Sequence, residues 1–424
     1  MKKLLYFILK ILSRKALKKY RPLVIAVTGS LGKTSAKDAI FAVLRGSKSV
    51  RRSQGNYNNE LGVPLAVLGV DTGGRSVFKW LKVLAAAGGL IYFKKEYPEI
   101  LILEMGAEKA GDINYLTGFV PVDIGVVTGI SQVHLEFFGD LETVAQEKLS
   151  LFRKFEDQSK LAVVNLDDEK IRAKVGEIAG KVITYGFSDG ADFRAGDFKI
   201  TKQGEAFGTL FKLHFQEQTI PVFLPNIFGR QQVYACLPAL AIGCSLGNKL
   251  LETVDDLAKY RPPQGRTNLI PGIKHTYLID DSYNSSPAAA KAALEVLDQF
   301  PVEGRKIAVF GKMLELGSYQ EEGHREVGKK AAEVNLAMLV AVGEMSRDII
   351  RGAVEAGLPE ERTFYFDNNH QAGIFVQNKL KENDLILIKG SQGARMEQIV
   401  KELMAEPLKA RDLLVRQSDK WLAT

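Results

Sequence analysis

Eight residues, TGSLGKTS at 28–35, have the composition of a phosphate-binding loop. They follow a strand-like apolar run and precede a helical stretch, so glycine backbone N–H groups and a helix N-terminus can surround a phosphate. Lys33 can then reach the β- and γ-phosphates, and the hydroxyl of Thr34 can ligate Mg²⁺. The common pattern has a glycine where this chain has Val27, which makes the loop a shortened variant. The predicted nucleotide-binding residues are Gly29, Ser30, Gly32, Lys33, Thr34 and Ser35.

Two further side chains could form a metal site beside this loop. Glu104 ends the apolar run EILILE, where a buried carboxylate needs a cation or a hydrogen-bond donor. Alone it could equally cap a neighbouring helix, but together with Thr34 it predicts a Mg²⁺ site. His134 follows another strand-like run, VDIGVVTGI, and is a candidate ligand for a metal or a phosphate. A lone histidine is more often a polar surface residue, and both interpretations stay open from these residues alone.

These candidate residues stand where apolar runs end, and the runs alternate with helix-length segments. Such alternation predicts a parallel sheet with helices on both faces, with ligand sites at the carboxyl ends of the strands. Residues 192–224 instead predict antiparallel strands. The stretch YRPPQGRTN at 260–268 is typical of a hinge. We therefore predict an α/β protein with a segment at 1–21, a central P-loop ATPase domain at 22–260 and a C-terminal Rossmann-like domain at 261–424.

Composition excludes two classes of partner and site. The formal net charge is +7, but residues 1–21 contain eight Lys or Arg and no acidic residue. The basic character is therefore local, and no nucleic-acid partner is predicted. With only Cys236 and Cys244, neither a disulfide framework nor a four-cysteine zinc site can form, which fits a reducing cytoplasm.

Residues 1–21 form a basic segment with an amphipathic pattern. Lys10 interrupts the apolar run, which is far shorter than the ~20 residues that span a membrane. As a helix, the segment would place Lys3, Lys10 and Arg14 opposite an apolar face, a pattern suited to peripheral contact with an anionic membrane. The residues of that face are Leu4, Leu5, Ile8, Ile11 and Leu12. The alternative is a helix that packs on its own domain, on the apolar stretch at 75–95.

Ten ordered motifs between about residues 22 and 405 together resemble the Mur ligase family, most closely its D-alanyl-D-alanine-adding branch. They are TGSLGKTS, NYNNELGVPL, LEMGAEKAGDI, HLEFFGDLETVAQEK, VNLDDE, GRTN, DDSYNSSP, MLELG, HREVG and KGSQGARME. The resemblance implies a monomeric, ATP- and Mg²⁺-dependent enzyme of cell-wall precursor synthesis. It also implies that an amino acid or dipeptide is joined to an acceptor carboxylate through an acyl phosphate.

The same resemblance implies roles for individual residues. Lys33 is expected at the γ-phosphate, Thr34 and Glu104 at one Mg²⁺ ion, and His134 at a second. Lys148 matches the family's lysine that reacts with CO₂ to give a carbamate, which would bring an anion to the second metal. The catalytic set implied in this way is Lys33, His134, Lys148 and Arg266, with Arg266 at the γ-phosphate. The nucleotide-side matches are Asn165, Asp281, Tyr283 and Asn284, and the substrate-side matches are Asn56, Asn58, Asn59, Lys389 and Ser391.

Several features depart from the family pattern. Gln231 and Gln232 stand at the base-side motif, and Lys312 and Gln392 stand where the amino component is recognised. The loop also begins as early as Thr28, so we expect no counterpart of the family's UDP-binding domain before it. Three alternatives therefore stay open: a Mur-type ligase for a lipid-linked or other non-UDP acceptor, a folylpolyglutamate synthase-like enzyme, and a nucleotide-binding relative without ligase activity.

Overall fold

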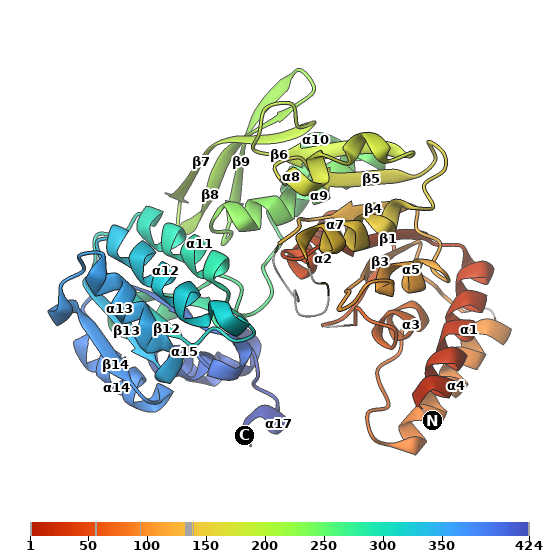
Figure 1. The fold of residues 1–424 in the computed structure, drawn as a ribbon. Helices are drawn as coiled ribbons and strands as arrows, with labels where there is room; N and C mark the ends of the chain where they lie inside the picture. The colour runs from red at the N-terminus through yellow and green to blue at the C-terminus, as the bar shows by residue number, and fades with distance from the viewer. Residues whose placement is uncertain (1, 56, 94, 132–137, 139, 423–424) are drawn as a thin grey trace. The chain divides into compact units, whose positions relative to one another are not determined.

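The computed structural model describes residues 2–55, 57–93, 95–131, 138 and 140–422. The chain divides into two compact units (Figure 1). Unit 1 comprises Met1–Asp197, Phe211–Val222 and Gln232–Tyr260. Unit 2 comprises Phe198–Leu210, Phe223–Gln231 and Arg261–Thr424. Each unit has its own hydrophobic core and is described by itself.

One sheet has the strand order β2-β3-β1-β4-β5-β6-β7-β8-β9, with β1 to β6 in unit 1 and residues of β7, β8 and β9 in both units. The strands from β2 to β7 pair in parallel. Two-residue turns join β7, β8 and β9, and such turns connect antiparallel neighbours. The predicted α/β class is therefore confirmed. The bounds are β1 (Leu23–Thr28), β2 (Val50–Arg52), β3 (Ile100–Glu104), β4 (Ile124–Val127), β5 (Leu161–Asn165), β6 (Lys181–Gly186), β7 (Phe193–Gln203), β8 (Ala206–Phe215) and β9 (Gln218–Pro225).

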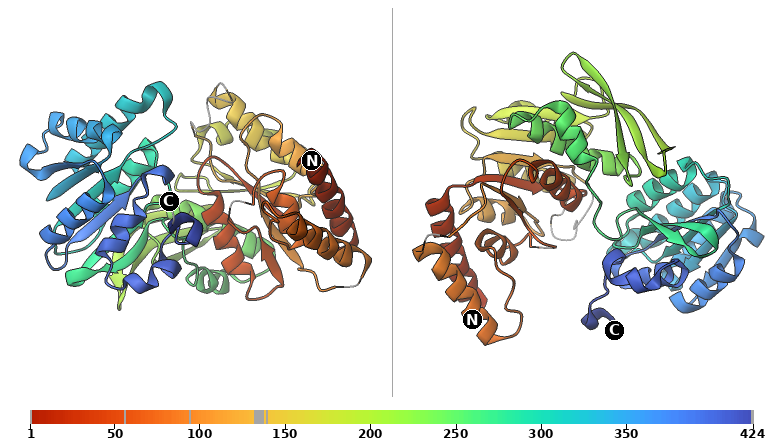
Figure 2. Two further views of the ribbon diagram at one scale, coloured as in Figure 1. Left: turned by 90° about the horizontal axis from the view of Figure 1, so that it is seen from below. Right: turned by 180° about the vertical axis from the view of Figure 1, so that it is seen from behind.

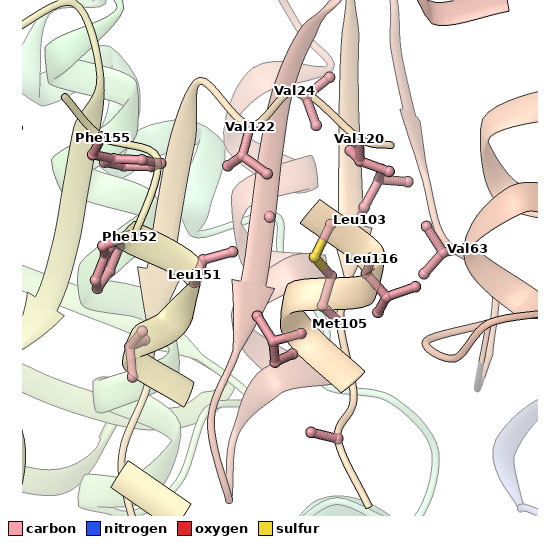
Figure 3. Close-up of a cluster of buried hydrophobic side chains, with 14 of the residues drawn as sticks. Val24, Val63, Leu103, Met105, Leu116, Val120, Val122, Leu151, Phe152 and Phe155 are labelled. Carbon is pink, nitrogen blue, oxygen red and sulfur yellow. The ribbon is translucent and has the colours of Figure 1, made fainter. Parts of the chain in front are cut away.

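The central strands of this sheet are apolar because helices cover both of their faces. Every residue of β3 and β4 is buried, which makes the carboxylate at the end of β3 exceptional. Figure 3 shows one core cluster, in which Leu103 of β3 lies near Met105 and Leu116, and Phe152 lies beside Leu151. The helices are α1 (Lys2–Tyr20), α2 (Lys33–Leu44), α3 (Gly62–Leu68), α4 (Val77–Tyr92), α5 (Asp112–Thr117), α7 (Leu141–Leu149), α8 (Glu169–Arg172), α9 (Arg230–Ser245) and α10 (Leu250–Leu257), with 3₁₀ turns at Ser150–Phe152 and Val175–Glu177.

The basic N-terminal segment forms α1, which packs on α3 and α4 (Figure 2). Its buried face is centred on Leu9 and Ala16. This corrects the predicted apolar face, because Leu4 and Ile11 are exposed while Leu5 and Leu12 pack against the core. The helix meets two neighbours, and their position decides which side is buried. Within the described part of the chain, no helix combines the length and apolarity needed to cross a bilayer.

Unit 2 contains a second sheet with the order β10-β11-β15-β12-β13-β14. β10 is antiparallel to β11, and the other neighbours are parallel. Two core clusters, one around Leu294 and Leu387 and one around Val309 and Ile399, contain buried residues of its strands and helices. The strands are β10 (Asn268–Gly272), β11 (Thr276–Asp281), β12 (Lys306–Gly311), β13 (Met338–Val342), β14 (Thr363–Phe366) and β15 (Leu385–Lys389). The helices are α11 (Pro287–Gln299), α12 (Gln320–Glu333), α13 (Arg347–Glu355), α14 (Asn369–Lys379), α15 (Glu397–Leu403), α16 (Ala410–Leu413) and α17 (Asp419–Leu422).

Candidate active site

The predicted phosphate-binding loop connects the end of β1 with the start of α2. Gly29 has φ +139° and Gly32 has φ +78°, conformations that other residues adopt only with strain. A Cβ atom at Gly29 would lie 2.1 Å from Oγ1 of Thr128. Both glycines are therefore required by the path of the backbone, which leaves the N-terminus of α2 open for an anion.

The end of β4 holds this loop in place. The backbone N–H of Ser30 donates to the carbonyl oxygen of Gly129 at 2.7 Å, and the Thr128 hydroxyl donates to the carbonyl oxygen of Leu31 at 2.5 Å. The backbone N–H of Ser131 donates to Oγ of Ser30 at 3.0 Å. The loop is thus preformed, so little of the binding energy of a phosphate is lost to ordering the backbone.

Lys33 folds back over its own loop. Its ammonium donates to the carbonyl oxygens of Gly29 at 2.7 Å and Ser30 at 3.2 Å. Phosphate oxygens are stronger acceptors for an ammonium than neutral carbonyls. The lysine can therefore exchange these contacts for a phosphate without a large movement of the helix.

Glu104, at the end of β3, lies beside Thr34 as predicted for a metal site. The carboxylate is 1% exposed and accepts a hydrogen bond from the Thr34 hydroxyl at 2.9 Å. Its second oxygen accepts from the side-chain amide of Asn58 at 3.0 Å. The ammonium of Lys37 lies 3.6 Å from the carboxylate. A hydroxyl and a fixed carboxylate are oxygen ligands suited to Mg²⁺, so these residues fit the ion.

Lys148 of α7 is buried close to Lys33. Burial, followed by the charge of Lys33, lowers the pKa of Lys148 to about 8. Its ammonium donates to the carbonyl oxygen of Ala107 at 3.2 Å. The neighbouring Glu147 accepts from the backbone N–H groups of Gly111 and Ile113 at the start of α5, so α7 is fixed against that helix. Lys148 therefore occupies a fixed position with a larger neutral fraction than an exposed lysine has.

Asn165, the last residue of β5, is hydrogen-bonded to the residue that follows β4 and so connects the next turn to the phosphate loop. Its amide nitrogen donates to the carbonyl oxygen of Thr128 at 3.2 Å. Two residues on, Asp167 accepts from the hydroxyl of Tyr234 at 2.6 Å and from the backbone N–H of Phe187 at 2.6 Å. Burial raises the pKa of Asp167, but these bonds and those from Ser188 lower it more, so the net shift is downward. The turn is thus held by a charged acceptor.

Four other predicted site residues belong to this part of the chain, and the structure describes two of them, Asn59 and Ser35. Asn59 accepts from the backbone N–H groups of Leu61 at 3.2 Å and Gly62 at 2.9 Å, at the start of α3. Ser35 is buried in α2. His134 and Asn56 lie outside the described residues. The described part of the chain contains no group of three or more His, Cys, Asp or Glu side chains that could hold a metal.

In unit 2, the predicted residues gather at the carboxyl ends of β11 and β15. Asp281 accepts from the buried ammonium of Lys389 at 2.6 Å and from the backbone N–H of Thr267 at 3.1 Å. Lys389 also donates to the carbonyl oxygen of Asn284 at 2.9 Å. The Ser391 hydroxyl accepts from the backbone N–H of Leu314 at 2.9 Å. These contacts fix the ends of the strands, where ligands of parallel sheets bind.

Arg266 lies over the ring of Tyr283, with its guanidinium carbon 4.2 Å from the ring centroid. The backbone N–H of Tyr283 donates to the carbonyl oxygen of Gly265 at 3.1 Å. Gly265 has φ +67°, and a Cβ atom there would lie 2.9 Å from that nitrogen. The stacked pair presents a cation beside an aromatic surface.

Sequence reasoning missed two cations. Lys37 is 1% exposed and stands one helical turn after Lys33, a spacing that could have placed both on one side of α2. Arg416 donates to the carbonyl oxygen of Ser282 at 3.1 Å and to Glu397 at 3.0 Å. No local pattern predicted Arg416, because its partners are distant in sequence.

Two segments of the chain match known domain families. Residues 89–243 match the Mur ligase middle domain, and residues 265–392 match the Mur ligase, glutamate ligase domain. The UDP-N-acetylmuramoyl-tripeptide--D-alanyl-D-alanine ligase of Bacillus subtilis (strain 168) is 30% identical over 385 residues, covering 91% of this chain and 76% of that ligase. The chain belongs to the Mur ligase family.

Solved structures agree with this assignment. The MurF ligase from Thermotoga maritima, solved in complex with ADP, has a TM-score of 0.76 to this Mur ligase. That likeness covers 96% of this chain and 84% of the other at 26% identity. MurF from Acinetobacter baumannii has a TM-score of 0.75 and 27% identity, over 92% of this chain and 79% of its own. This Mur ligase is therefore an ATP-dependent enzyme that forms amide bonds.

Proposed function

We propose that this Mur ligase adds D-alanyl-D-alanine to the carboxylate of a UDP-N-acetylmuramoyl tripeptide in cell-wall precursor synthesis. The observation that carries the proposal is the preformed phosphate loop beside the Thr34 and Glu104 pair, in a chain that covers 76% of a ligase of that name. The acceptor carboxylate attacks the γ-phosphorus of ATP, which gives an acyl phosphate and ADP. The amine of the dipeptide then attacks the acyl carbon, and phosphate leaves.

Residues of unit 1 would position ATP for this reaction. Lys33 and the backbone N–H groups of the loop would bind the β- and γ-phosphates. Thr34 and Glu104 would hold one Mg²⁺, with the Asn58 amide orienting the carboxylate at 3.0 Å. When bound, the ion neutralises charge on the transferred phosphoryl group. A preformed site of this kind favours the transition state because its dipoles need no reorganisation.

We propose that Lys148 carries a carbamate in the active enzyme. The observation that supports this is its burial close to Lys33 and its pKa, which burial lowers to about 8. A neutral amine attacks the carbon of CO₂, the new N–C bond forms and one N–H proton is released. The product is an anion, which would favour a second Mg²⁺ together with His134. It would also replace a cation that Lys33 repels.

Residues of the segment 261–424 would complete the reaction as a separate C-terminal domain. Asp281, Asn284 and Tyr283 would contact the nucleoside, and Arg266 would reach the γ-phosphate. Lys389 and Ser391 would face the dipeptide, as Asn56, Asn58 and Asn59 would face the acceptor. Asp281 and Lys389 already form an ion pair of 2.6 Å, so each fixes the other.

We propose that the enzyme acts as a monomer at the inner face of the membrane.

The test is phosphate release from ATP with a panel of acceptors and amino components. UDP-muramoyl tripeptide with D-Ala-D-Ala should give the highest rate, above lipid-linked precursors, folates and single amino acids. Lys33→Ala should abolish turnover and keep the fold, whereas Lys249→Ala, at an exposed lysine, should change nothing. Retained turnover in folded Lys33→Ala protein, or a higher rate with another acceptor, would overturn the proposal.

A further inference from the structure

The helix α4 exposes an unusual number of large apolar side chains. Phe78 is 80% exposed and Leu81 is 58% exposed, although the opposite side of the helix packs in the core through Val83 and Leu90. Large apolar side chains on both sides of a helix indicate a second contact surface. The large apolar residues that this helix and its end expose are Val77, Phe78, Leu81, Tyr92 and Phe93.

The helix α1 lies beside α4 and runs in the same direction (Figures 1 and 2). At their C-terminal ends, the Lys19 ammonium donates to the carbonyl oxygen of Phe93 at 2.7 Å and the Tyr20 hydroxyl to that of Leu90 at 2.8 Å. The two N-terminal halves therefore lie together as well. There α1 exposes Leu4 and Phe7 by more than half, so both helices carry exposed large apolar side chains.

The charges on the two helices themselves have one sign. Neither α1 nor α4 contains an acidic residue. Lys79 and Lys82 of α4 are exposed, as are Lys15 and Lys18 of α1. Elsewhere on α1, Arg14, Lys18 and Arg21 line a cavity of about 890 Å³ with Lys154, Lys160 and Asp123, which pairs with Lys160 at 2.7 Å. An anionic partner is therefore favoured over a neutral or basic one.

Exposed aromatic and aliphatic side chains among lysines suit a phospholipid surface better than a protein interface. The cores of protein interfaces are depleted in lysine, whereas interfacial helices combine lysine with Phe, Leu and Trp. Each basic residue near an anionic bilayer adds to the attraction, and the apolar side chains enter the headgroup region. The charge and the apolar area thus point to one occupant.

We propose that the α1–α4 surface docks on an anionic phospholipid bilayer. This surface is defined by Leu4, Phe7, Ile11, Val77, Phe78, Leu81, Tyr92 and Phe93 with the lysines and arginines beside them. The inference deepens the proposed location at the membrane, but it does not rest on the identity of the acceptor. It assigns to α4 the role that the sequence suggested for the N-terminal segment alone.

The test is co-flotation of the full chain with vesicles of phosphatidylcholine, with and without phosphatidylglycerol. Deleting α1 would remove Leu9 and Ala16 from the core, so point substitutions are used. The double variant Phe78→Ser/Leu81→Ser should bind anionic vesicles at least tenfold more weakly than the unaltered protein. Leu251→Ser/Leu408→Ser, which also replaces two exposed leucines, should bind unchanged. Lys79→Gln/Lys82→Gln should weaken binding and its dependence on salt.

Three flotation results would overturn the inference. They are no flotation of the unaltered protein, equal flotation of the Phe78→Ser/Leu81→Ser variant, and equal binding to vesicles with and without phosphatidylglycerol. Sedimentation velocity tests a second copy of this chain as the occupant. If the unaltered protein self-associates and the variant does not, the surface is a contact between copies. ATP turnover of the variant in solution should be unchanged, so a failed ligase assay and a failed membrane assay remain distinguishable.

Discussion

Replacing Lys37 by methionine should destabilise unit 1 by about 3 kcal/mol at neutral pH, within the range for a buried ion pair that loses one partner. The ammonium lies 3.6 Å from Glu104 and 3.4 Å from Asp38, and both Lys37 and Glu104 are almost fully buried. At an effective dielectric of ~20, one such pair contributes about 4 to 5 kcal/mol. Arg52, at 3.1 Å from Asp38, stays in place and reduces the loss. Methionine keeps most of the packing, so the loss is electrostatic.

Thermal unfolding followed by tryptophan fluorescence measures this effect. The chain has two tryptophans, Trp80 in unit 1 and Trp421 in unit 2, so a Trp421→Phe background reports unit 1. A loss of ~3 kcal/mol corresponds to a fall in Tm of roughly 6 to 12 °C for a unit of this size. Lys249→Met, at a lysine whose side chain is 84% exposed, is the matched control and should shift Tm little.

Two further measurements can refute this assignment: the same substitution in a Glu104→Gln background, and the pH dependence of the loss of stability. In a Glu104→Gln background the same substitution should cost much less, because the buried carboxylate is gone. Burial raises the pKa of Asp38, and Lys37 is the first of the charges that lower it. Without Lys37 that pKa should rise further, so the folded state binds a proton more readily and the deficit should shrink as the pH falls. A loss below about 1 kcal/mol, or an equal loss in both backgrounds, would refute the assignment.

Three further changes test other parts of the structure. Burial raises the pKa of Asp280 in the folded state to about 7. The stability that the folded state gains from protonated Asp280 is therefore lost as the pH rises through that value. Asp280→Asn should therefore remove the fall of the urea midpoint of unit 2 between about pH 4 and pH 7, and an unchanged slope would be a contrary result. Lys148→Ala should be nearly inactive, and short carboxylic acids should partly restore its phosphate release by taking the place of the carbamate. If Lys148 carries no carbamate in the unaltered enzyme, these acids should restore no activity. Gly29→Ala should weaken ATP binding at least tenfold by calorimetry because its Cβ would clash with Thr128, whereas Gly176→Ala, with nothing within 4 Å, should not.

Local chemistry was enough to find the loop and its strand. Gly29 and Gly32 are required because the backbone there has positive φ, a property of each residue rather than of its neighbours. The apolar runs of the sheet are equally local, since a strand buried on both faces must be apolar along its length. For this reason the α/β class, the P-loop between β1 and α2 and the family could be predicted.

Contacts between distant residues had to come from the tertiary structure. The predicted role of Asn58 at a substrate stays a prediction, but only the tertiary structure shows that its amide also holds Glu104, which is 46 residues away. Lys37 was not predicted, because a buried lysine on α2 is recognisable only when the carboxylate of β3 lies against it. His134 lies outside the described residues, so its role stays a prediction.

The sequence by itself therefore determined which segments become strands, helices and phosphate loop, and also that residues 1–21 are basic and amphipathic. It could not decide which side of α1 is buried, because Leu4 and Leu9 are equally apolar. The tertiary structure decided this, since α3 and α4 lie against the side of Leu9 and leave Leu4 exposed. Helix periodicity fixes which residues share a face, but burial depends on the neighbours that reach that face.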